Sequence, residues 1–311
     1  MVQNKSVENI IIIGGGPAGL SAALYAARAE LSPLVLSGIE LGGQAALTER
    51  IENYPGFPMG ISGAELMELF QENAERFGAR VQLETVSSVD FSIRPFYINT
   101  QEKQYFAHSV VISTGADPRK LNIPGETELC GRGVSYCATC DGRFFKDKKI
   151  AVIGGGDSAL EESLLLTRFA SSVTVVHRRA ELRASAILQK RARENKKIQF
   201  VWNSIVESIN GAEAVNSISI KNILNGNQTT LPMDGVFIFI GHSPNSDIFK
   251  EYLKRDEKGY LKVDRHLQTS LPGVFAAGEV ADNFYRQVII SAGMGAAAAI
   301  EATYYLQNLE L

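Results

Sequence analysis

The sequence predicts an α/β protein built from two Rossmann-like, doubly wound nucleotide-binding domains, one inserted into the other. One glycine-rich motif, Gly14-Gly-Gly-Pro-Ala-Gly19, follows the apolar run Val7–Ile13 and precedes an alanine-rich segment. A related motif, Gly154-Gly-Gly-Asp-Ser-Ala159, again lies between an apolar run and a helix pattern. A continuous apolar run before such a turn is typical of a parallel strand buried on both faces. Two copies of strand, glycine turn and helix therefore indicate two sheets, each with a dinucleotide site.

The elements of the first copy follow in the order of a Rossmann-like unit. The alanine-rich stretch Leu20–Ala29 predicts a helix, and Leu34–Leu36 predicts the second strand. A capping region is expected over Gly38–Tyr105, with one clear helix pattern at Gly63–Phe77. Val110–Gly115 then predicts a strand that ends in a glycine turn.

The second copy repeats this order after the first is complete. Lys149–Ile153 predicts a strand, Ser158–Phe169 a helix, and Val173–Val176 the next strand. Val236–Ile240 predicts a further buried strand. The repetition is an internal duplication of one supersecondary unit, so each copy should build its own sheet.

Two linker-like segments indicate that the second domain is inserted into the first. Ala116–Pro124 contains two prolines and several charges, and Gly241–Asn245 has the composition of a return linker. The tail predicts the strand Val274–Ala277, the turn Gly278–Asp282 and a helix near Ser291–Leu306. We therefore expect one domain over residues 1–116 and 247–311, and a second over residues 117–246.

The bulk composition is that of an ordinary globular protein. A formal net charge of −3 gives no reason to expect nucleic acid or an anionic membrane as a partner. The longest apolar runs are too short to span a bilayer, and no secretory signal pattern opens the chain. Three cysteines in 311 residues argue against a disulfide scaffold, so we expect a cytoplasmic protein.

Each glycine-rich motif has the residues that a pyrophosphate site needs. In Gly14-x-Gly16-x-x-Gly19 the first glycine makes the tight turn, the second admits the pyrophosphate and the third lets helix and strand pack closely. The phosphates then lie at a helix N-terminus, which favours negative charge. Packing alone also produces such turns, but the strand and helix patterns on both sides favour nucleotide binding in both copies.

The second copy predicts NADPH. A site for unphosphorylated NAD has an Asp or Glu after the second strand, to bind the ribose 2′-hydroxyl. This chain instead has the basic residues His177, Arg178, Arg179 and Arg183 there. Guanidinium groups suit a 2′-phosphate. The basic run that follows, Lys190 to Lys197, is expected to be mainly the solvated face of a helix, with partner docking as the alternative.

Cys137-Ala-Thr-Cys140 predicts a small redox disulfide. Such a pair opens and closes without rearranging the fold, and its spacing often lowers one thiol pKa. Asp141 has the chemistry of a general acid or base, although a turn or cap role fits it equally well. A structural zinc site needs four ligands, whereas this chain has one such pair, the single Cys130 and four isolated histidines, so we expect no metal.

A nicotinamide site, a second dinucleotide site and a cysteine pair are the parts needed to pass electrons through a flavin to a disulfide. The first copy is therefore expected to bind the flavin. Glu40 follows the second strand and has the reach for an adenosine ribose, although Ser37 and Gly38 occupy the more usual position.

Together these motifs resemble the low-molecular-weight thioredoxin reductases, which depend on NADPH and FAD. The resemblance covers nearly the whole chain, and the cysteine motif Cys137-Ala-Thr-Cys-Asp-Gly142 is its most specific part. The other matching motifs are Gly14–Gly19, Gly42–Gln44, Glu52–Gly56, Ser113–Gly115, Gly154–Ala159, His177–Arg179, Gly241–Asn245 and Tyr285–Gln287.

The resemblance implies the residues that hold each cofactor. For FAD they are Gly14, Gly16, Pro17, Ala18, Gly19, Glu40, Gln44, Asn53, Thr114, Gly115, Gly278, Glu279, Arg286 and Gln287. For NADPH they are Gly154, Gly156, Asp157, Ser158, Ala159, His177, Arg178, Arg179 and Arg183. Glu279 departs from the family, which usually has Asp there to bond a flavin ribityl hydroxyl; the longer side chain can do so only if the turn shifts.

The resemblance also implies the activity. Electrons pass from NADPH through FAD and the Cys137–Cys140 disulfide to thioredoxin, with Cys140 beside the flavin and Asp141 as the acid/base residue. The family forms homodimers and alternates between two domain orientations, for which the two linkers provide the hinge. The alternatives are a related flavin-dependent dithiol oxidase, a reductase of another disulfide, or a nucleotide-responsive redox sensor without sustained turnover.

Overall fold

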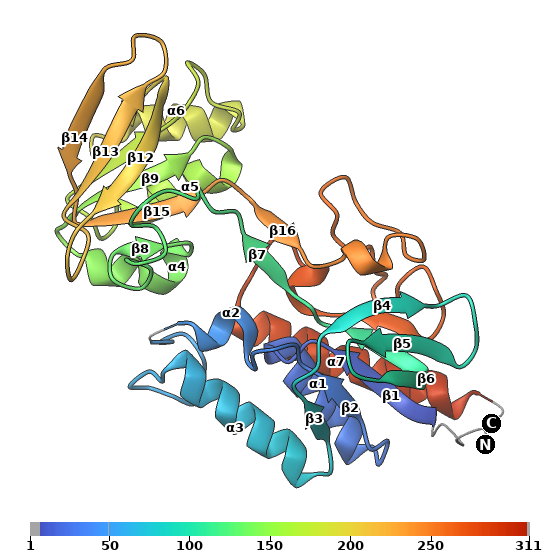
Figure 1. Cartoon of the computed structure of the whole chain (residues 1–311). Helices are drawn as coiled ribbons and strands as arrows, with labels where there is room; N and C mark the ends of the chain where they lie inside the picture. The colour runs from blue at the N-terminus through green and yellow to red at the C-terminus, as the bar shows by residue number, and fades with distance from the viewer. Residues whose placement is uncertain (1–6, 49, 310–311) are drawn as a thin grey trace. The chain divides into compact units, whose positions relative to one another are not determined.

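The computed structural model describes residues 7–48 and 50–309. The chain forms two compact units, Met1–Asp117 with Ser243–Leu311, and Pro118–His242 (Figure 1). The two segments that join the units, β7 (Ala116–Pro118) and β16 (His242–Pro244), pair with each other as a two-stranded sheet.

The first unit is built on a seven-stranded sheet, in which β3, β2, β1, β6, β5 and β4 are neighbours in that order and β17 also pairs with β6. The strands around β1 are parallel, whereas β4, β5 and β6 pair antiparallel. The strands are β1 (Val7–Ile13), β2 (Leu34–Leu36), β3 (Arg80–Gln82), β4 (Val86–Asp90), β5 (Phe96–Thr100), β6 (Gln104–Ile112) and β17 (Val274–Ala276).

Two helices pack together on this sheet. The helix α1 (Pro17–Arg28) begins at the first glycine turn, and its alanines form one core cluster with Ala298, Ala299 and Ala302 of α7 (Val288–Gln307). The small side chains permit close approach, since a Cβ on Gly295 would lie 1.9 Å from Ala18 O. The remaining helical segments are α2 (Gly43–Ala46), α3 (Gly63–Arg76), η2 (Asp247–Phe249) and η3 (Gly278–Val280).

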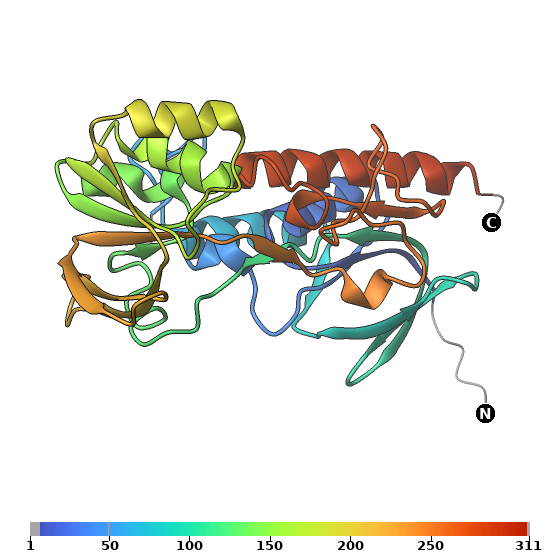
Figure 2. The same ribbon diagram turned by 90° about the horizontal axis from the view of Figure 1, so that it is seen from above.

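The helix α7 is the long helix that ends near the C-terminus in Figure 2. Among the described residues it is the one helix whose length and composition would let it cross a membrane, and a third of its most apolar window is buried. Because the core helix of a globular unit meets the same criteria, and α7 contributes to the cluster shared with α1, we interpret it as a core helix.

The second unit contains a five-stranded parallel sheet with the order β11, β10, β9, β15 and β8. Its strands are β8 (Val134–Ser135), β9 (Lys149–Gly154), β10 (Ser172–Val176), β11 (Ile198–Val201) and β15 (Gly235–Phe239). Its helices are α4 (Ala138–Asp141), η1 (Gly142–Phe145), α5 (Asp157–Leu166) and α6 (Ala186–Glu194). An antiparallel sheet of β12 (Ser204–Asn210), β13 (Ser217–Asn222) and β14 (Gln228–Pro232) completes the unit.

The sequence predicts the main parallel strands and their helices, but it does not predict several short strands. The region Gly38–Tyr105, expected to be a cap, also supplies β3, β4 and β5 to the main sheet, so that expectation was incomplete. These strands have at most five residues and partly exposed faces, which leaves little apolar periodicity to recognise. The linker-like segments are partly strand, because β7 and β16 satisfy each other's backbone groups.

Candidate functional site

In the first glycine turn, Gly14 and Gly19 are tightly packed, whereas Gly16 faces open space. A Cβ on Gly14 would lie 2.3 Å from Ser113 O, and one on Gly19 would lie 1.9 Å from Gly14 O. At Gly16 the nearest atom would be 3.8 Å away. Gly16 is also the N-cap of α1, and no side chain caps that helix. The turn therefore leaves both the room and the free N–H groups that a phosphate requires.

The second turn has the same arrangement at the start of α5. A Cβ on Gly154 would lie 2.5 Å from Phe239 O, whereas a Cβ on Gly156 would meet nothing within 4 Å. No side chain caps α5. The Asp157 carboxylate accepts a hydrogen bond from the Ser185 N–H at 2.7 Å, which ties the loop before α6 to this turn. The space at Gly156 and the uncapped N-terminus fit a second pyrophosphate.

His177 is buried beneath the second turn. A Cβ on Gly155 would lie 2.3 Å from its ring, and its Nε2 lies 3.0 Å from Glu181 O. Burial lowers the pKa of His177, with the nearby Arg183 and Arg179 adding to the shift. A neutral, packed imidazole supports the turn instead of offering a cation, so its role as an NADPH ligand stays a prediction.

The three arginines after β10 differ from His177 because they are exposed. Arg178, Arg179 and Arg183 form no ion pair with any residue in the described part of the chain. The Arg183 N–H donates to Gly155 O at 2.7 Å, which places the arginine segment directly against the glycine turn. Three uncompensated guanidinium groups beside a phosphate turn suit one further anionic group.

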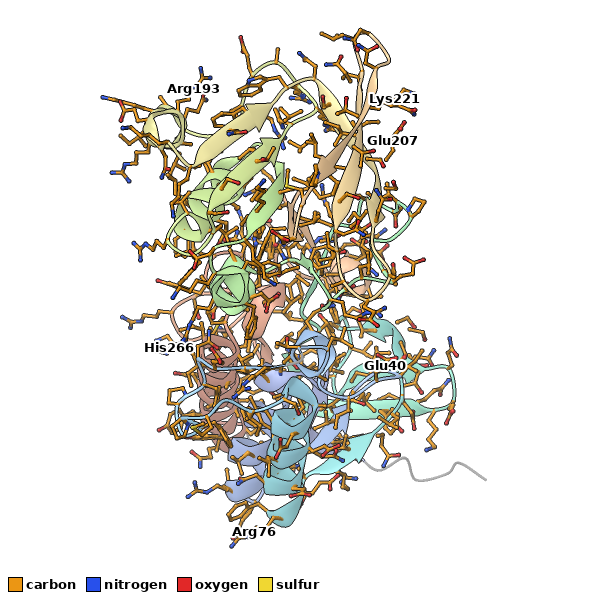
Figure 3. The ribbon with its side chains drawn as sticks, turned by 90° about the vertical axis from the view of Figure 1, so that its left-hand side faces the viewer. Glu40, Arg76, Arg193, Glu207, Lys221 and His266 are labelled. Atoms are coloured by element: carbon orange, nitrogen blue, oxygen red, sulfur yellow. A yellow bond between two sulfur atoms is a disulfide. The ribbon has the colours of Figure 1, made fainter. Side chains whose placement is uncertain are left out.

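The sequence interpretation missed an aromatic group at the end of β11. The Trp202 ring stacks on Phe200 with centroids 4.9 Å apart and lies 6.4 Å from the His177 ring. The guanidinium of Arg193, labelled in Figure 3, lies 5.9 Å from the Trp202 ring, so Arg193 is not merely part of a solvated face. The available signal was that Trp202 is the chain's single tryptophan and follows a strand.

In the first unit, hydrogen bonds bring together several of the residues expected around FAD. Gln44 Nε2 donates to Asp117 Oδ1 at 3.0 Å, and Asn53 Nδ2 donates to Gln287 Oε1 at 3.0 Å. Thr114 Oγ1 donates to Asn245 O at 2.7 Å, and the Asn245 N–H donates to Gly115 O. Segments far apart in sequence therefore meet around one region. Asp117 was not among the predicted site residues.

The Gly278 turn holds a titratable carboxyl group. A Cβ on Gly278 would lie 2.9 Å from the Ala18 Cβ, so a glycine is required against α1. Burial raises the pKa of Glu279 to about 7; Arg286 opposes this shift, while Asp282 and Asp117 add to it. Arg286 Nε is itself buried without a hydrogen-bond partner. A buried, unsatisfied guanidinium donor suits an anionic or carbonyl oxygen of a cofactor.

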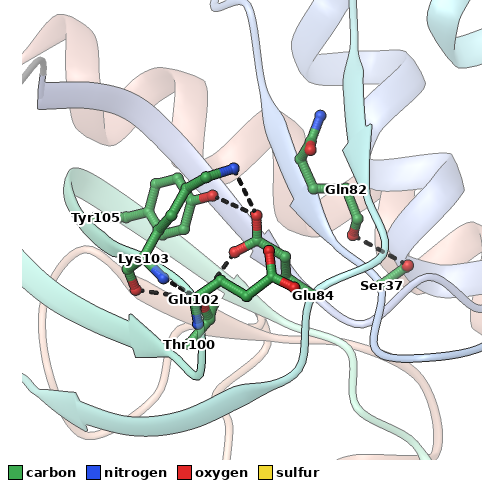
Figure 4. A network of polar contacts seen from close by, with 7 residues as sticks. All are labelled: Ser37, Gln82, Glu84, Thr100, Glu102, Lys103 and Tyr105. Carbon is green, nitrogen blue, oxygen red and sulfur yellow. Dashed lines mark hydrogen bonds and ion pairs between the residues drawn. The ribbon is translucent and has the colours of Figure 1, made fainter.

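The end of β2 is supported by a buried carboxylate rather than by Glu40. Glu40 is exposed on the surface (Figure 3), whereas Ser37 is buried and its Oγ donates to Gln82 O at 3.2 Å. The Gly38 N–H donates to Glu84 O, and the Glu84 carboxylate accepts hydrogen bonds from Thr100, Lys103 and Tyr105 (Figure 4). Burial alone would raise the pKa of Glu84, but these hydrogen bonds outweigh it and lower it.

The cysteine pair lies at the junction of β8 and α4. Cys137 and Cys140 form a disulfide with a Cα–Cα distance of 5.4 Å. The Cys140 N–H donates to Cys137 Sγ at 3.2 Å, and the Asp141 N–H donates to Cys137 O at 3.2 Å. One tight turn therefore holds both sulfurs and Asp141. Over residues 7–48 and 50–309, no group of three or more His, Cys, Asp or Glu side chains is placed to hold a metal ion.

Ser135, which the sequence interpretation did not include, lies within this turn. It is buried at the end of β8, and its Oγ lies 2.6 Å from Asp141 Oδ2. The Cys137 N–H donates to Ser135 Oγ at 3.1 Å. The only sequence signal was a serine two residues before the first cysteine, which is too common to single out.

Comparisons with known proteins agree over nearly the whole chain. The family model described as pyridine nucleotide-disulphide oxidoreductase matches residues 8–299. A thioredoxin reductase of Streptomyces coelicolor is 49% identical, over 98% of this chain and 96% of the relative. A bifunctional thioredoxin reductase/thioredoxin of Mycobacterium leprae is 51% identical, over 97% of this chain and 67% of its own length. The crystal structure of thioredoxin reductase from Streptococcus pyogenes matches with a TM-score of 0.93 and 42% identity, covering 98% of this chain and all of that one.

Proposed function

The chain belongs to the thioredoxin reductases of the pyridine nucleotide-disulphide oxidoreductase family, and from that premise we propose that it reduces the disulfide of thioredoxin with electrons from NADPH. The observation that carries the proposal is the Cys137–Cys140 disulfide, in a chain that also has two open glycine turns. The relative in which a thioredoxin reductase is joined to a thioredoxin supports this choice of substrate.

The family uses a flavin and a nicotinamide, and we assign FAD to the first unit and NADPH to the second. The open space at Gly16 and the unpartnered Arg286 Nε support FAD in the first unit. The space at Gly156 and the exposed Arg178 and Arg179 support a dinucleotide that carries a 2′-phosphate. When bound, the nicotinamide supplies a hydride and the flavin relays its two electrons to the disulfide.

At the cysteine pair, the electrons and protons taken up by the Cys137–Cys140 disulfide equal those passed to thioredoxin. Two electrons and two protons convert the Cys137–Cys140 disulfide into two thiols. One of them, as a thiolate, attacks the thioredoxin disulfide, breaks its S–S bond and forms a mixed disulfide. The second cysteine then attacks the mixed disulfide, which re-forms the Cys137–Cys140 bond and leaves two electrons and two protons on thioredoxin. We assign Asp141 to move the protons of this exchange, since it shares the turn that holds both sulfurs.

We further propose a cytoplasmic homodimer whose second unit moves relative to the first during turnover. The family resemblance supports the dimer and the motion, and the low cysteine content supports a reducing compartment. The paired connecting segments β7 and β16 are the place where such a motion would hinge.

The deciding experiment is anaerobic NADPH consumption by the FAD-loaded protein with and without a bacterial thioredoxin. We expect sustained consumption only when thioredoxin is present. A single stoichiometric reduction that stops in the presence of thioredoxin would contradict the proposal. Consumption that then resumes with oxygen or with a small disulfide would identify a dithiol oxidase or another disulfide reductase.

Serine substitutions of the cysteines separate the steps of the relay. Cys137→Ser or Cys140→Ser is expected to abolish thioredoxin reduction, because no disulfide forms, while NADPH still bleaches the flavin. Cys130→Ser is the matched control, because Cys130 is the chain's remaining cysteine and is exposed. Thioredoxin reduction at the parental rate by either paired-cysteine variant would show that this disulfide is not the relay.

A further inference from the structure

The Ser135 hydroxyl connects Asp141 with the backbone of the redox turn. Its Oγ lies 2.6 Å from Asp141 Oδ2 and 3.3 Å from Cys137 O, and it accepts the Cys137 N–H at 3.1 Å. A serine hydroxyl has one proton to donate. A carboxylate is a stronger acceptor than a peptide carbonyl, and the shorter distance is to the carboxylate, so the proton is directed to Asp141.

The hydrogen bond between Ser135 and Asp141 starts from a buried side chain, that of Ser135. Ser135 is buried at the end of β8, the edge strand of the parallel sheet, and the pairing of Ser135 with Phe237 of β15 fixes its position. Its partner Asp141 closes α4, whose N-cap is Cys137. A change in the charge of Asp141 therefore acts on Ser135 and, through it, on the Cys137 amide.

We propose that Ser135 is a positioning residue for thiol–disulfide exchange: its hydroxyl holds the Asp141 carboxylate in the ionised form against the turn that carries both sulfurs. A hydrogen bond donated to a carboxylate favours the ionised form. In that form Asp141 can take the proton of a thiol, which produces the nucleophilic thiolate. The inference rests on the proposed role of Asp141 in the proposed function.

Other ionisable groups near Asp141 also affect the charge of this region, so their contribution to a pH profile has to be distinguished from that of Asp141. The charges of Cys130 and Asp141 interact with each other, and Lys120 and Glu126 also act on Cys130. Glu126 is held by the Tyr136 hydroxyl at 2.8 Å and by the Leu121 and Asn122 N–H groups. Arg143 follows Asp141 by two residues. All measurements therefore use a Cys130→Ser background, which removes the one other thiol that titrates beside Asp141.

The test follows the reactivity of the cysteines in the whole protein rather than turnover. The protein is reduced with dithiothreitol and treated with iodoacetamide between about pH 5 and pH 10, and alkylation of the Cys137–Cys140 peptide is measured by mass spectrometry. We expect Ser135→Ala to move the midpoint of alkylation upward by about one pH unit, because the hydroxyl no longer compensates the Asp141 charge, which then disfavours the neighbouring thiolate more strongly. Ser135→Thr, which keeps the hydroxyl, should retain the parental midpoint.

Two further variants make the outcome decisive. Ser109→Ala removes a buried serine hydroxyl that donates only to Gly273 O, in the other unit, and should leave the profile unchanged. Asp141→Asn removes the negative charge that disfavours a neighbouring thiolate, so it should move the midpoint downward, and adding Ser135→Ala to it should cause no further shift. A parental profile for Ser135→Ala, or a shift that persists in the Asp141→Asn background, would overturn the proposal. Because alkylation needs neither NADPH nor thioredoxin, a failure of the proposed function is detected separately, by the turnover assay.

Discussion

At the scale of single residues, the exposed arginines after β10 are the clearest test of nucleotide choice. Arg178 and Arg179 lack ion-pair partners in the described structure and lie beside the Gly155 turn through the backbone bond of Arg183. Replacing both with Ala should raise the KM for NADPH about 10- to 100-fold, because charge-assisted hydrogen bonds to a 2′-phosphate are lost. The KM for NADH should change little.

Steady-state kinetics with both nucleotides measures this selectivity. Lys190→Ala is a suitable control, since Lys190 is an exposed cation on α6 that pairs with Glu194 at 3.9 Å. Equal changes in the two KM values for the arginine variant would show that these side chains do not read a 2′-phosphate.

Glu279 gives a prediction about pH. Burial raises its pKa in the folded protein to about 7 from 4.5, so between these values the folded FAD-free protein binds more protons at this site than the unfolded chain. Its contribution to the free energy of unfolding is therefore present below about pH 4.5 and is lost as the pH rises through about 7, by roughly 3 kcal/mol in total. Glu279→Gln should remove this dependence.

Urea unfolding of FAD-free parent and variant at about pH 5 and pH 8 gives the difference directly, because contributions common to both proteins cancel. Glu68→Gln provides the control, since Glu68 is exposed on α3. A stability difference between parent and Glu279→Gln that is the same at both pH values would show that Glu279 does not titrate in this window.

At the scale of elements, apolar runs and glycine motifs in the sequence predict the central strands and the two nucleotide-binding turns. The strands β1, β9 and β15 are continuous apolar runs, and the two turns that follow β1 and β9 contain their three-residue glycine signatures, so these elements could be located before the structure. The predicted helices Ser158–Phe169 and Ser291–Leu306 correspond to α5 and α7, with ends that differ by a few residues.

What the sequence could not predict are the contacts that depend on the fold. Glu84 is a charged residue between short strands, and only the assembled sheet shows it buried among Thr100, Lys103 and Tyr105 (Figure 4). Asp117 gains its partner Gln44 in the same way, by tertiary approach, whereas Ser135 meets Asp141 within one local turn whose geometry the sequence does not specify. The burial of His177 under the Gly155 turn also depends on the fold, and its role as an NADPH ligand stays a prediction.

At the scale of the whole molecule, each unit has its own hydrophobic core. The clusters around Ile10, Ile11 and Leu20 contain only residues of the first unit. The clusters around Ala138 and Leu129 contain only residues of the second. The second unit is also one continuous segment, and its ends meet, since the Arg119 N–H donates to Gly241 O at 2.9 Å. An insertion with adjacent ends and a separate core has the properties of an independent domain.

We therefore expect a fragment of residues 118–242 to fold by itself. It should unfold cooperatively in urea, and Trp202, as the only tryptophan, reports the transition by fluorescence without interference. It should also bind 2′,5′-ADP, which carries the 2′-phosphate, because Arg178, Arg179 and the Gly154 turn all belong to this segment. A fragment with Arg178 and Arg179 replaced by Ala is the control, since it should fold equally well but lose this binding. A fragment that lacks a cooperative transition would mean that the second core depends on the first unit, and that the two nucleotide sites form one folding unit despite their separate clusters.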